Sequence, residues 1–337
     1  MDWEEMRQVV KELEMPPFSV SQIMDWVYVK KAPSIACMTN LSQKSRERLD
    51  TVCEVGFQKP VESVSAPDGT VKYLFEAPAG AFVEAVYIPD GERATLCLSS
   101  QVGCKMGCRF SMTGKQGFTA NLTAGDILNQ FYALPGRDTL TNIVFMGMGE
   151  PCDNLDEVLK ALRLFTDPKG LAWSPRRITV STVGLKKGLR RLVEESECHL
   201  AISLHSPTHD QRESLIPAEH AFEAAEMVQL LRGYDFSHQR RLSFEYILFK
   251  GVNDSLRSAR ELIDLLHGLD CRVNLIGYHS IPSVDLQGLS RDEMITFRDY
   301  LTAHGLFATL RASRGEEIFA ACGMLSTDKK KKVDETK

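Results

Sequence analysis

The spacing of hydrophobic positions changes along the chain and predicts several kinds of local structure. Residues 1–55 carry apolar side chains at helical intervals, and Ser19 and Ser42 stand where they can cap two helices. From 62 to 88 apolar and polar positions alternate, with a turn at 67–69, which predicts a β-hairpin and a further strand. The remainder of the chain alternates between short apolar runs and amphipathic segments.

This alternating remainder predicts a parallel sheet covered by helices. Strands are expected at 95–99, 142–146, 177–181, 199–204, 242–248 and 272–276. A helix is expected from about 123, where Thr123 and Asp126 have the spacing of a capping box. Further helices are expected at 153–166, at 185–195, near 210, and at 220–232, 255–269 and 290–304. Because strands joined by helices run parallel with right-handed crossovers, six such units predict an α/β fold, a partial (βα)6 barrel.

These changes of pattern also set the expected domain boundaries. We expect a helical accessory domain at 1–55, a β-hairpin extension at 56–92, the partial barrel at 93–325 and a charged tail at 326–337. Basic residues and an aromatic ring in the first domain are compatible with RNA contact. Its composition is equally compatible with a plain helical appendage.

Composition places the chain among ordinary globular proteins, because 43% of its 337 residues are hydrophobic and 25% are charged. No apolar run approaches the length of a membrane span, and the acidic N-terminus lacks the regions of a signal peptide. We therefore expect a cytoplasmic location and no membrane partner. Nine cysteines in such a chain indicate thiols, ligands or catalytic groups.

The net charge of −5 is a mild argument against RNA binding, which depends mainly on neutralised phosphates. Local basic pairs, such as those at 176–177, 186–187 and 240–241, can still bind phosphates. Taken singly, each pair is better interpreted as a solvated face.

A glycine-rich stretch at 95–118 holds the most distinctive cysteine pattern. Cys104 and Cys108 are spaced C-x3-C after a short apolar strand, and the glycines allow both thiolates to face one centre. An iron–sulfur site would place a third soft ligand about three residues later. The sequence has Ser111 there, and the spacing alone is also compatible with a two-cysteine loop that binds nothing.

The residues flanking this loop resemble the RlmN/Cfr family. The resemblance rests on Cys97, on Ser-Ser-Gln-Val-Gly-Cys at 99–104 and on Thr-Gly-Lys-Gln-Gly-Phe at 113–118. Family members are radical S-adenosylmethionine (radical SAM) enzymes that methylate carbon 2 or carbon 8 of an adenine in RNA. The run at 115–118 is similar to the RlmN, carbon-2 branch.

The resemblance also implies a cofactor and its ligands. In the family a Cys-x3-Cys-x2-Cys run binds three irons of a [4Fe-4S] cluster and leaves the fourth iron for the substrate. The matching positions here are Cys104, Cys108 and Ser111.

Unusual residues gather where the predicted strands end, which is the edge that carries the active site in barrel-like βα folds. By resemblance they contact S-adenosylmethionine, and they are Gly149, Glu150, Ser181, Ser203, Leu204, His205 and His279. Exposed glycine carbonyls followed by a carboxylate suit the ammonium group of that cofactor. A Gly/Pro turn is the alternative for 147–151, and structural hydrogen bonding is the alternative for the histidines.

Three further residues have chemical roles implied by the resemblance. Cys322, between alanine and glycine, is an unshielded thiol that would accept a methyl group. Cys97 would resolve the protein–RNA adduct through a transient disulfide with Cys322. Glu84, thirteen residues before Cys97, would accept a proton, whereas a strand carboxylate of no special role would face solvent.

The resemblance thus implies methylation of adenine carbon 2 through a methyl-cysteine intermediate and two S-adenosylmethionine molecules. The expected substrates are large-subunit ribosomal RNA and tRNA, and an electron donor such as flavodoxin or ferredoxin is expected as a partner. The alternative is a cluster-deficient, inactive or impaired RNA-binding relative, or an introduced Cys-to-Ser replacement. Ser111 carries that alternative because a hydroxyl is a hard, poorly ionised ligand.

Overall fold

The computed structural model describes residues 1–237, 240–281 and 284–311, so Cys322 lies outside the described residues. In this part of the chain, ten strands form one sheet in the order β1-β2-β3-β4-β7-β8-β9-β10-β11-β12. They are β1 (Glu62–Ser65), β2 (Val71–Ala77), β3 (Ala81–Asp90), β4 (Arg93–Cys97), β7 (Asn142–Phe145), β8 (Ile178–Thr182), β9 (His199–Ser203), β10 (Leu242–Leu248), β11 (Arg272–Gly277) and β12 (Ala308–Leu310).

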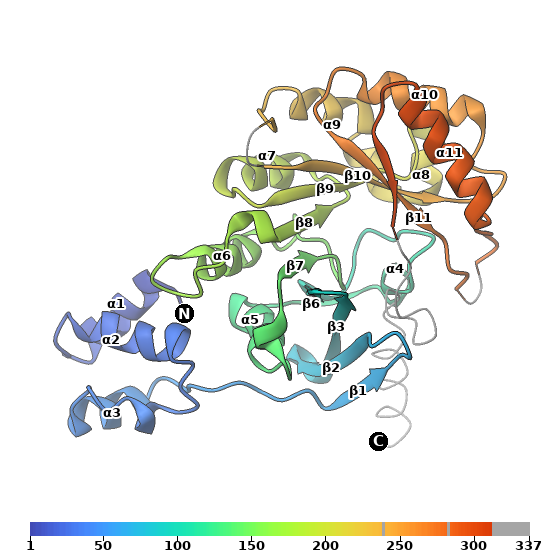
Figure 1. The fold of residues 1–337 in the computed structure, drawn as a ribbon. Coiled ribbons are helices and arrows are strands. Elements are labelled where there is room, and N and C mark those ends of the chain that lie inside the picture. The colour runs from blue at the N-terminus through green and yellow to red at the C-terminus, as the bar shows by residue number, and fades with distance from the viewer. Residues whose placement is uncertain (238–239, 282–283, 312–337) are drawn as a thin grey trace.

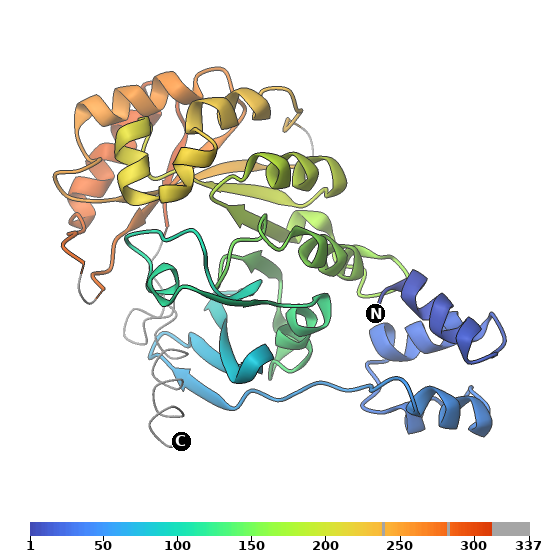
Figure 2. The ribbon, with the colours of Figure 1, turned by 180° about the vertical axis from the view of Figure 1, so that it is seen from behind.

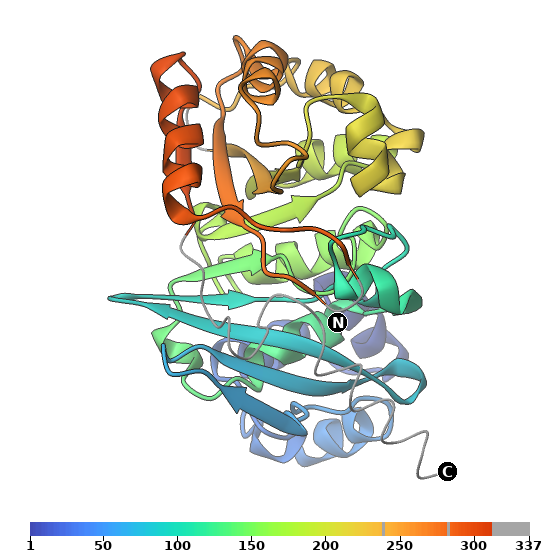
Figure 3. The ribbon, with the colours of Figure 1, turned by 90° about the vertical axis from the view of Figure 1, so that its right-hand side faces the viewer.

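Within this sheet, every pair from β4–β7 to β11–β12 is parallel, whereas the pairs β1–β2, β2–β3 and β3–β4 are antiparallel. Figure 3 shows the strands following one another from the blue hairpin to the orange strands. The predicted α/β fold with a parallel sheet is confirmed, and the hairpin predicted between 62 and 88 continues that sheet.

Helices connect the parallel strands, and Figures 1 and 2 show them from opposite sides. The helices are α1 (Trp3–Glu12), α2 (Ser19–Met24), α3 (Gln43–Asp50), α4 (Met112–Gln116), α5 (Ala124–Tyr132), α6 (Leu155–Thr166), α7 (Lys186–Glu195), α8 (His209–Leu215), α9 (Ala224–Leu231), α10 (Leu256–Leu266) and α11 (Arg291–Ala303). The first three gather at one side of the molecule, where Glu5 of α1 pairs with Lys160 of α6. None of the helices described is both long and apolar enough to cross a membrane.

The two faces of the parallel sheet differ in polarity. One face packs against the helices through buried apolar residues: Leu96, Ile143, Phe145, Ile178, Val180, Leu200, Ile202, Phe244, Tyr246, Val273 and Leu275. The alternate positions include polar and charged residues: Thr179, Ser181, His199, Ser203, Ser243, Glu245, Arg272 and Asn274. Parallel strands buried on both faces are usually apolar throughout, so this second face, called the inner face below, is available for a polar ligand.

Some local predictions need correction. Ser42 and Thr123 cap α3 and α5 as predicted, but Ser19 is the first residue of α2 and caps nothing, since the residue before the helix is Phe18. Helix α1 begins instead at a capping box formed by Asp2 and Glu5. The strand β12 and the short antiparallel pair β5 (Gln101–Gly103) and β6 (Phe118–Asn121) were not expected, because three- and four-residue strands carry too little periodicity.

Candidate active site

The two cysteines of the C-x3-C motif lie on a loop that a small β-hairpin closes. Strands β5 and β6 pair on either side of the loop, and the Cys104 N–H donates to the Gly117 carbonyl over 3.1 Å. At Gly103 the backbone has a φ of +75°, and a Cβ there would lie 1.8 Å from the same carbonyl oxygen. Only glycine therefore allows the two ends of the loop to meet.

Both thiols of this loop are partly buried, and without a metal they are protonated at neutral pH. Burial raises the pKa of Cys104 to about 11 and that of Cys108 to about 12. A bound metal would reverse this effect, because a coordinated thiol loses its proton. The pair is thus arranged to become thiolate only when a cationic centre is present.

The third ligand position shows a different arrangement. Ser111 caps α4, and its hydroxyl accepts a hydrogen bond from the Gly114 N–H over 3.3 Å. Among the described residues, no three His, Cys, Asp or Glu side chains are grouped to hold a metal ion. A cluster held by this loop therefore fits with two thiolates from Cys104 and Cys108 and an oxygen donor from Ser111.

Cys152 follows Glu150 and is the extra thiol that a cluster could recruit. It is buried, and its thiol makes hydrogen bonds with Thr182 and Glu150, while burial raises its pKa well above the usual value. Its Cβ lies so close to α7 that a Cβ on Gly188 would be 2.7 Å away. Cys152 is fixed between β7 and α7, and this packing disfavours it as a replacement ligand.

Glu150 joins the ends of β7 and β8. Its buried carboxylate accepts hydrogen bonds from the Thr182 hydroxyl at 2.5 Å and from the Cys152 and Val183 N–H groups at 2.9 Å each. Burial raises its pKa, against the effect of these donors. The Cys152 thiol is a fourth donor, so the roughly four acceptor sites of this carboxylate are satisfied within the protein, and a ligand ammonium group would act on it mainly through its negative charge. Gly149, just before it, has a φ of +96° and packs against Gln101.

The predicted cofactor-binding residues at the ends of β8 and β9 divide into two kinds. Ser181 and Ser203 face each other with their hydroxyl oxygens 3.3 Å apart, and both are half-buried on the inner face. The side chain of Leu204 lies in the core, and His205 is buried with its Nδ1 accepting the Ile247 N–H over 3.0 Å. The structure thus brings together the hydroxyls of the two serines, which are open to a ligand. The side chains of Leu204 and His205 are instead buried and contact the protein itself.

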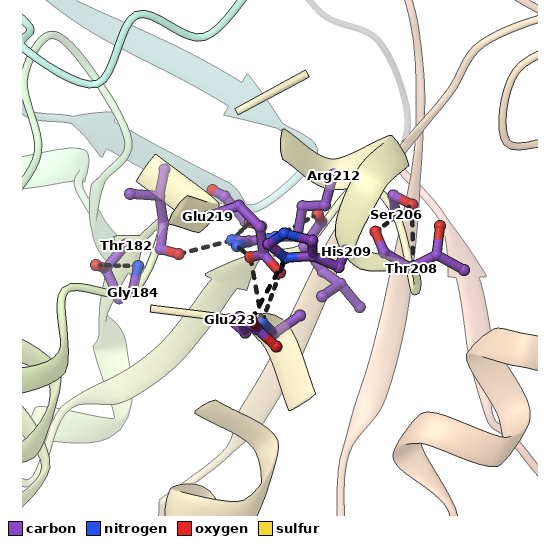
Figure 4. A network of polar contacts seen from close by, with 12 residues as sticks. Thr182, Gly184, Ser206, Thr208, His209, Arg212, Glu219 and Glu223 are labelled. Carbon is purple, nitrogen blue, oxygen red and sulfur yellow. Dashed lines mark hydrogen bonds and ion pairs between the residues drawn. The ribbon is translucent and has the colours of Figure 1, made fainter. Parts of the chain in front are cut away.

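An arginine that sequence reasoning missed holds these strand ends together (Figure 4). Arg212 of α8 is buried and donates to the carbonyls of Val183 at 2.7 Å, Ser203 at 2.9 Å and Leu204 at 2.9 Å. It also pairs with the buried carboxylate of Glu219. The only sequence signal was an arginine among the polar residues near 210, which ordinarily indicates a solvated helix face.

Glu84 is buried on the hairpin, in contrast to the solvent-facing position typical of a strand carboxylate. Its carboxylate lies 3.0 Å from the ammonium group of Lys72, and both side chains are at most 5% exposed. Register places Lys72 opposite Val86, and Val86 opposite Cys97. Alternation along β3 then puts Glu84, Lys72 and Cys97 on one face of the sheet. Lys72 was not predicted, because its partner is set by strand register.

The structure says less about the three remaining predicted residues, Cys97, His279 and Cys322. Burial raises the pKa of the Cys97 thiol to about 11, although a backbone hydrogen bond from Met146 and the charge of Arg311 oppose this. His279 is exposed, two residues beyond the end of β11. Cys322 lies outside the described residues, so its predicted meeting with Cys97 stays a prediction.

Comparison with known proteins gives consistent matches along the chain. Residues 1–55 match the model of the ribosomal RNA large subunit methyltransferase N-terminal domain, and residues 98–265 match that of the radical SAM superfamily. The chain is 63% identical to the probable dual-specificity RNA methyltransferase RlmN of Phocaeicola vulgatus, covering 98% of this chain and 94% of that protein. It is 41% identical to the dual-specificity RNA methyltransferase RlmN of Solidesulfovibrio magneticus, over 97% and 95% of the two chains.

A solved structure supports the same relationship. The crystal structure of a radical SAM methyltransferase from Sphaerobacter thermophilus superposes with a TM-score of 0.89 at 39% sequence identity. The match covers 96% of this chain and 97% of that one, so it includes the helical N-terminal segment, the hairpin and the parallel sheet.

Proposed function

The chain belongs to the RlmN family of radical SAM RNA methyltransferases, and from this premise we propose that it methylates carbon 2 of an adenine in RNA. Its substrates are large-subunit ribosomal RNA and tRNA, in keeping with the dual specificity in the names of its relatives. The observation that carries the proposal is the convergence of ligand-binding groups at one edge of the sheet. There the Cys104–Cys108 loop follows β4, Glu150 follows β7, and Ser181 and Ser203 end β8 and β9.

The family uses a [4Fe-4S] cluster and S-adenosylmethionine. When bound, these groups supply the radical and the methyl group that the reaction requires. We assign the cluster to Cys104, Cys108 and the oxygen of Ser111. The carboxylate of Glu150, the backbone of Gly149 and the hydroxyls of Ser181 and Ser203 would hold S-adenosylmethionine.

Three side chains would act on the RNA. A covalent route suits an electron-poor ring carbon, because it divides a difficult transfer into easier steps. Cys322 would accept a methyl group and carry it to the base, and Cys97 would release the product by forming a disulfide with Cys322. Glu84 would take the proton lost from the ring carbon. The location of Cys97 and Glu84 on one face of the sheet supports these roles.

The base must leave its stack to reach buried side chains, so the target is an adenosine in a loop or junction. His279 would contribute at the rim of the cofactor site, where its exposure permits contact with a ligand. A flavodoxin or ferredoxin would supply electrons, and the enzyme would work in the cytoplasm.

A second candidate function rests on Ser111. A hydroxyl is a weak substitute for a thiolate at iron, and this one already caps a helix. The chain would then bind RNA and S-adenosylmethionine but react slowly or not at all. The intact Glu150 network and the paired serines favour retained binding in either case.

The test measures 2-methyladenosine by mass spectrometry after anaerobic incubation with S-adenosylmethionine, reductant and an RNA fragment. We expect slow methylation by the chain as written and faster methylation by Ser111→Cys. Product at carbon 8 would reassign the chain to the other branch of the family. Product from Ser111→Cys alone would favour the second candidate, and no product from either protein would contradict the proposal.

A further inference from the structure

Four arginines gather at the amino ends of the parallel strands, opposite the candidate cofactor site. Arg176 precedes β8, Arg240 and Arg241 precede β10, and Arg272 begins β11. The charges of all four act on His199, the first residue of β9. We call Arg176, Arg240, Arg241 and Arg272 the arginine rim.

Carboxylates of the described residues leave most of this charge without an ion-pair partner. In the described ranges no carboxylate forms an ion pair with Arg176, Arg241 or Arg272. Arg240 donates to the carbonyls of Val193 at 2.6 Å and Leu192 at 3.2 Å, which fixes its position without cancelling its charge.

The carboxylates in the neighbourhood do not change this conclusion. Glu245 is engaged by Arg311 at 3.3 Å and by the Asn274 amide at 2.7 Å. Asp270 and Glu197 influence the rim only at longer range, without forming ion pairs with it in the described part of the chain. Among the residues that the structure describes, the rim therefore keeps a local positive charge, although the net charge of the chain is negative.

The pKa of His199 reflects the positive charge of the rim. Burial and then the four arginines lower its pKa to about 4, so its imidazole is neutral at physiological pH. Its Nδ1 accepts the backbone N–H of Arg241 over 2.9 Å, which leaves the other ring nitrogen as a neutral donor. A neutral donor among arginines suits an anionic oxygen.

A cavity of about 160 Å³ leads from this rim along the inner face of the sheet. Its lining includes His199, Arg241 and Arg272 of the strand beginnings, together with Val144 and Met146 of the neighbouring strand β7 and its end. Val144 is the register partner of Cys97, and Met146 provides the backbone hydrogen bond to the Cys97 thiol. The cavity thus connects the arginine rim with the proposed resolving cysteine.

We propose that the arginine rim binds backbone phosphates of the substrate RNA beside the target adenosine, while the base enters the cavity toward Cys97. This inference rests on the proposed function. Arg241 and Arg272 would make the principal contacts, since both line the cavity and neither has an ion-pair partner among the described residues. RNA would then approach from the amino-terminal edge and the cofactor from the carboxyl-terminal edge.

The test is the salt dependence of RNA binding by the full chain, measured by fluorescence anisotropy with a labelled tRNA. Each single-strand phosphate contact contributes about 0.7 to the slope of log K against log salt, so Arg241→Gln with Arg272→Gln should lower it by about 1.4. If wild type and variant bind equally at 1 M salt, this difference in slope predicts that the variant binds roughly 25-fold more weakly than wild type at 0.1 M salt. Arg241→Lys with Arg272→Lys should keep most of the slope.

The control pair is Arg190→Gln with Arg257→Gln, which removes the same charge from exposed positions on α7 and α10. An equal loss of slope in both pairs, or no loss in the rim pair, would overturn the inference. Inorganic phosphate at constant ionic strength is the other probe. If it binds the wild-type rim while the rim pair leaves the RNA slope unchanged, the site serves small phosphates and the RNA assignment is wrong. Failure of wild-type protein to bind RNA would instead contradict the proposed function.

Discussion

At the scale of single residues, the nature of one donor atom at position 111 controls the candidate cluster site. The loop is closed by glycines and a hairpin, and it presents two thiols irrespective of that atom. Sulfur would complete a set of three soft ligands, whereas the hydroxyl present is hard and already accepts a hydrogen bond. Folding and metal affinity are thus separable at this position.

We expect Ser111→Cys to raise the iron content after anaerobic reconstitution toward about four irons per chain, the composition of a [4Fe-4S] cluster held by thiolates. Iron analysis and visible absorption would measure this. Cys152→Ser is the matched control and should leave the iron content unchanged, because Cys152 is held by Thr182 and Glu150. Loss of iron in Cys152→Ser would identify it as a ligand. Full loading of the chain as written would show that the serine is an adequate donor.

His205 provides a prediction about pH. Burial, helped by the charge of Arg212, lowers its pKa to about 3, whereas an unfolded chain has a histidine pKa of about 6.5. The unfolded state therefore gains a proton first as pH falls. Stability from this residue is complete above pH 6.5 and declines toward pH 3, by at most about 1.4 kcal/mol per pH unit.

Nuclear magnetic resonance of the imidazole carbons should show no titration of His205 between pH 5 and 8. A His205 midpoint near 6.5 would contradict the buried, neutral state.

The Lys72–Glu84 pair gives a prediction that separates stability from chemistry. Lys72→Met would remove the ammonium group that lies 3.0 Å from the buried carboxylate and should lower the free energy of unfolding by about 3–5 kcal/mol. Replacing both residues, by Lys72→Met with Glu84→Leu, should recover much of that loss. Chemical denaturation measures both changes.

Glu84→Gln keeps the size of the side chain but cannot accept a proton. If Glu84 is the base, methylation should fall by about 10²–10⁴-fold in this variant while the protein remains folded. Normal methylation by Glu84→Gln would limit Glu84 to a structural role.

At the scale of elements, short connections after the strands position the site. Arg212 on α8 ties together the carbonyls that follow β8 and β9, and Glu150 ties the end of β7 to β8. These contacts hold neighbouring strand ends at fixed spacing, which is what a ligand touching several strands requires. The β5–β6 pair fixes the two ends of the cysteine loop in the same way. This pairing depends on Gly103, where the two strands lie too close together for a side chain.

We therefore expect Gly103→Ala to disrupt the cysteine loop without unfolding the barrel. The added Cβ would meet the Gly117 carbonyl oxygen at 1.8 Å, and the backbone there has a positive φ. Iron uptake should fall steeply, and the main unfolding transition should stay nearly unchanged. Gly136→Ala is the control, since its φ is also positive but its Cβ would meet nothing within 4 Å. Equal iron uptake in both variants would contradict this role of Gly103.

At the scale of the whole molecule, the sheet separates two kinds of surface. Its outer face is filled by helices and apolar packing, and its inner face carries polar groups from β4 to β11. The proposed cofactor residues lie at the carboxyl edge, and the arginine rim lies at the amino edge, with a cavity along the inner face. In the proposed arrangement, RNA and cofactor would therefore reach the same centre without competing for one entrance.

The sequence alone predicted features that depend on neighbours along the chain. Strand and helix alternation follows from local periodicity, and the cap at Thr123 follows from a side chain within one turn of the helix. The C-x3-C spacing and the polar residues after strands could likewise be identified directly, because chain connectivity puts the ends of parallel strands at one edge. Short elements such as β12 escaped detection because three residues carry too little pattern.

Only the tertiary structure decided which distant residues meet. Lys72 and Glu84 form a pair because the register of β2 and β3 places them on one face. No role was predicted for Arg212, yet packing of α8 against the strand ends buries it with three carbonyls and a carboxylate to satisfy it. Such contacts depend on how helices and strands pack against one another, and local composition does not determine this packing. The same charged side chain is solvated or buried according to the partners that folding brings to it.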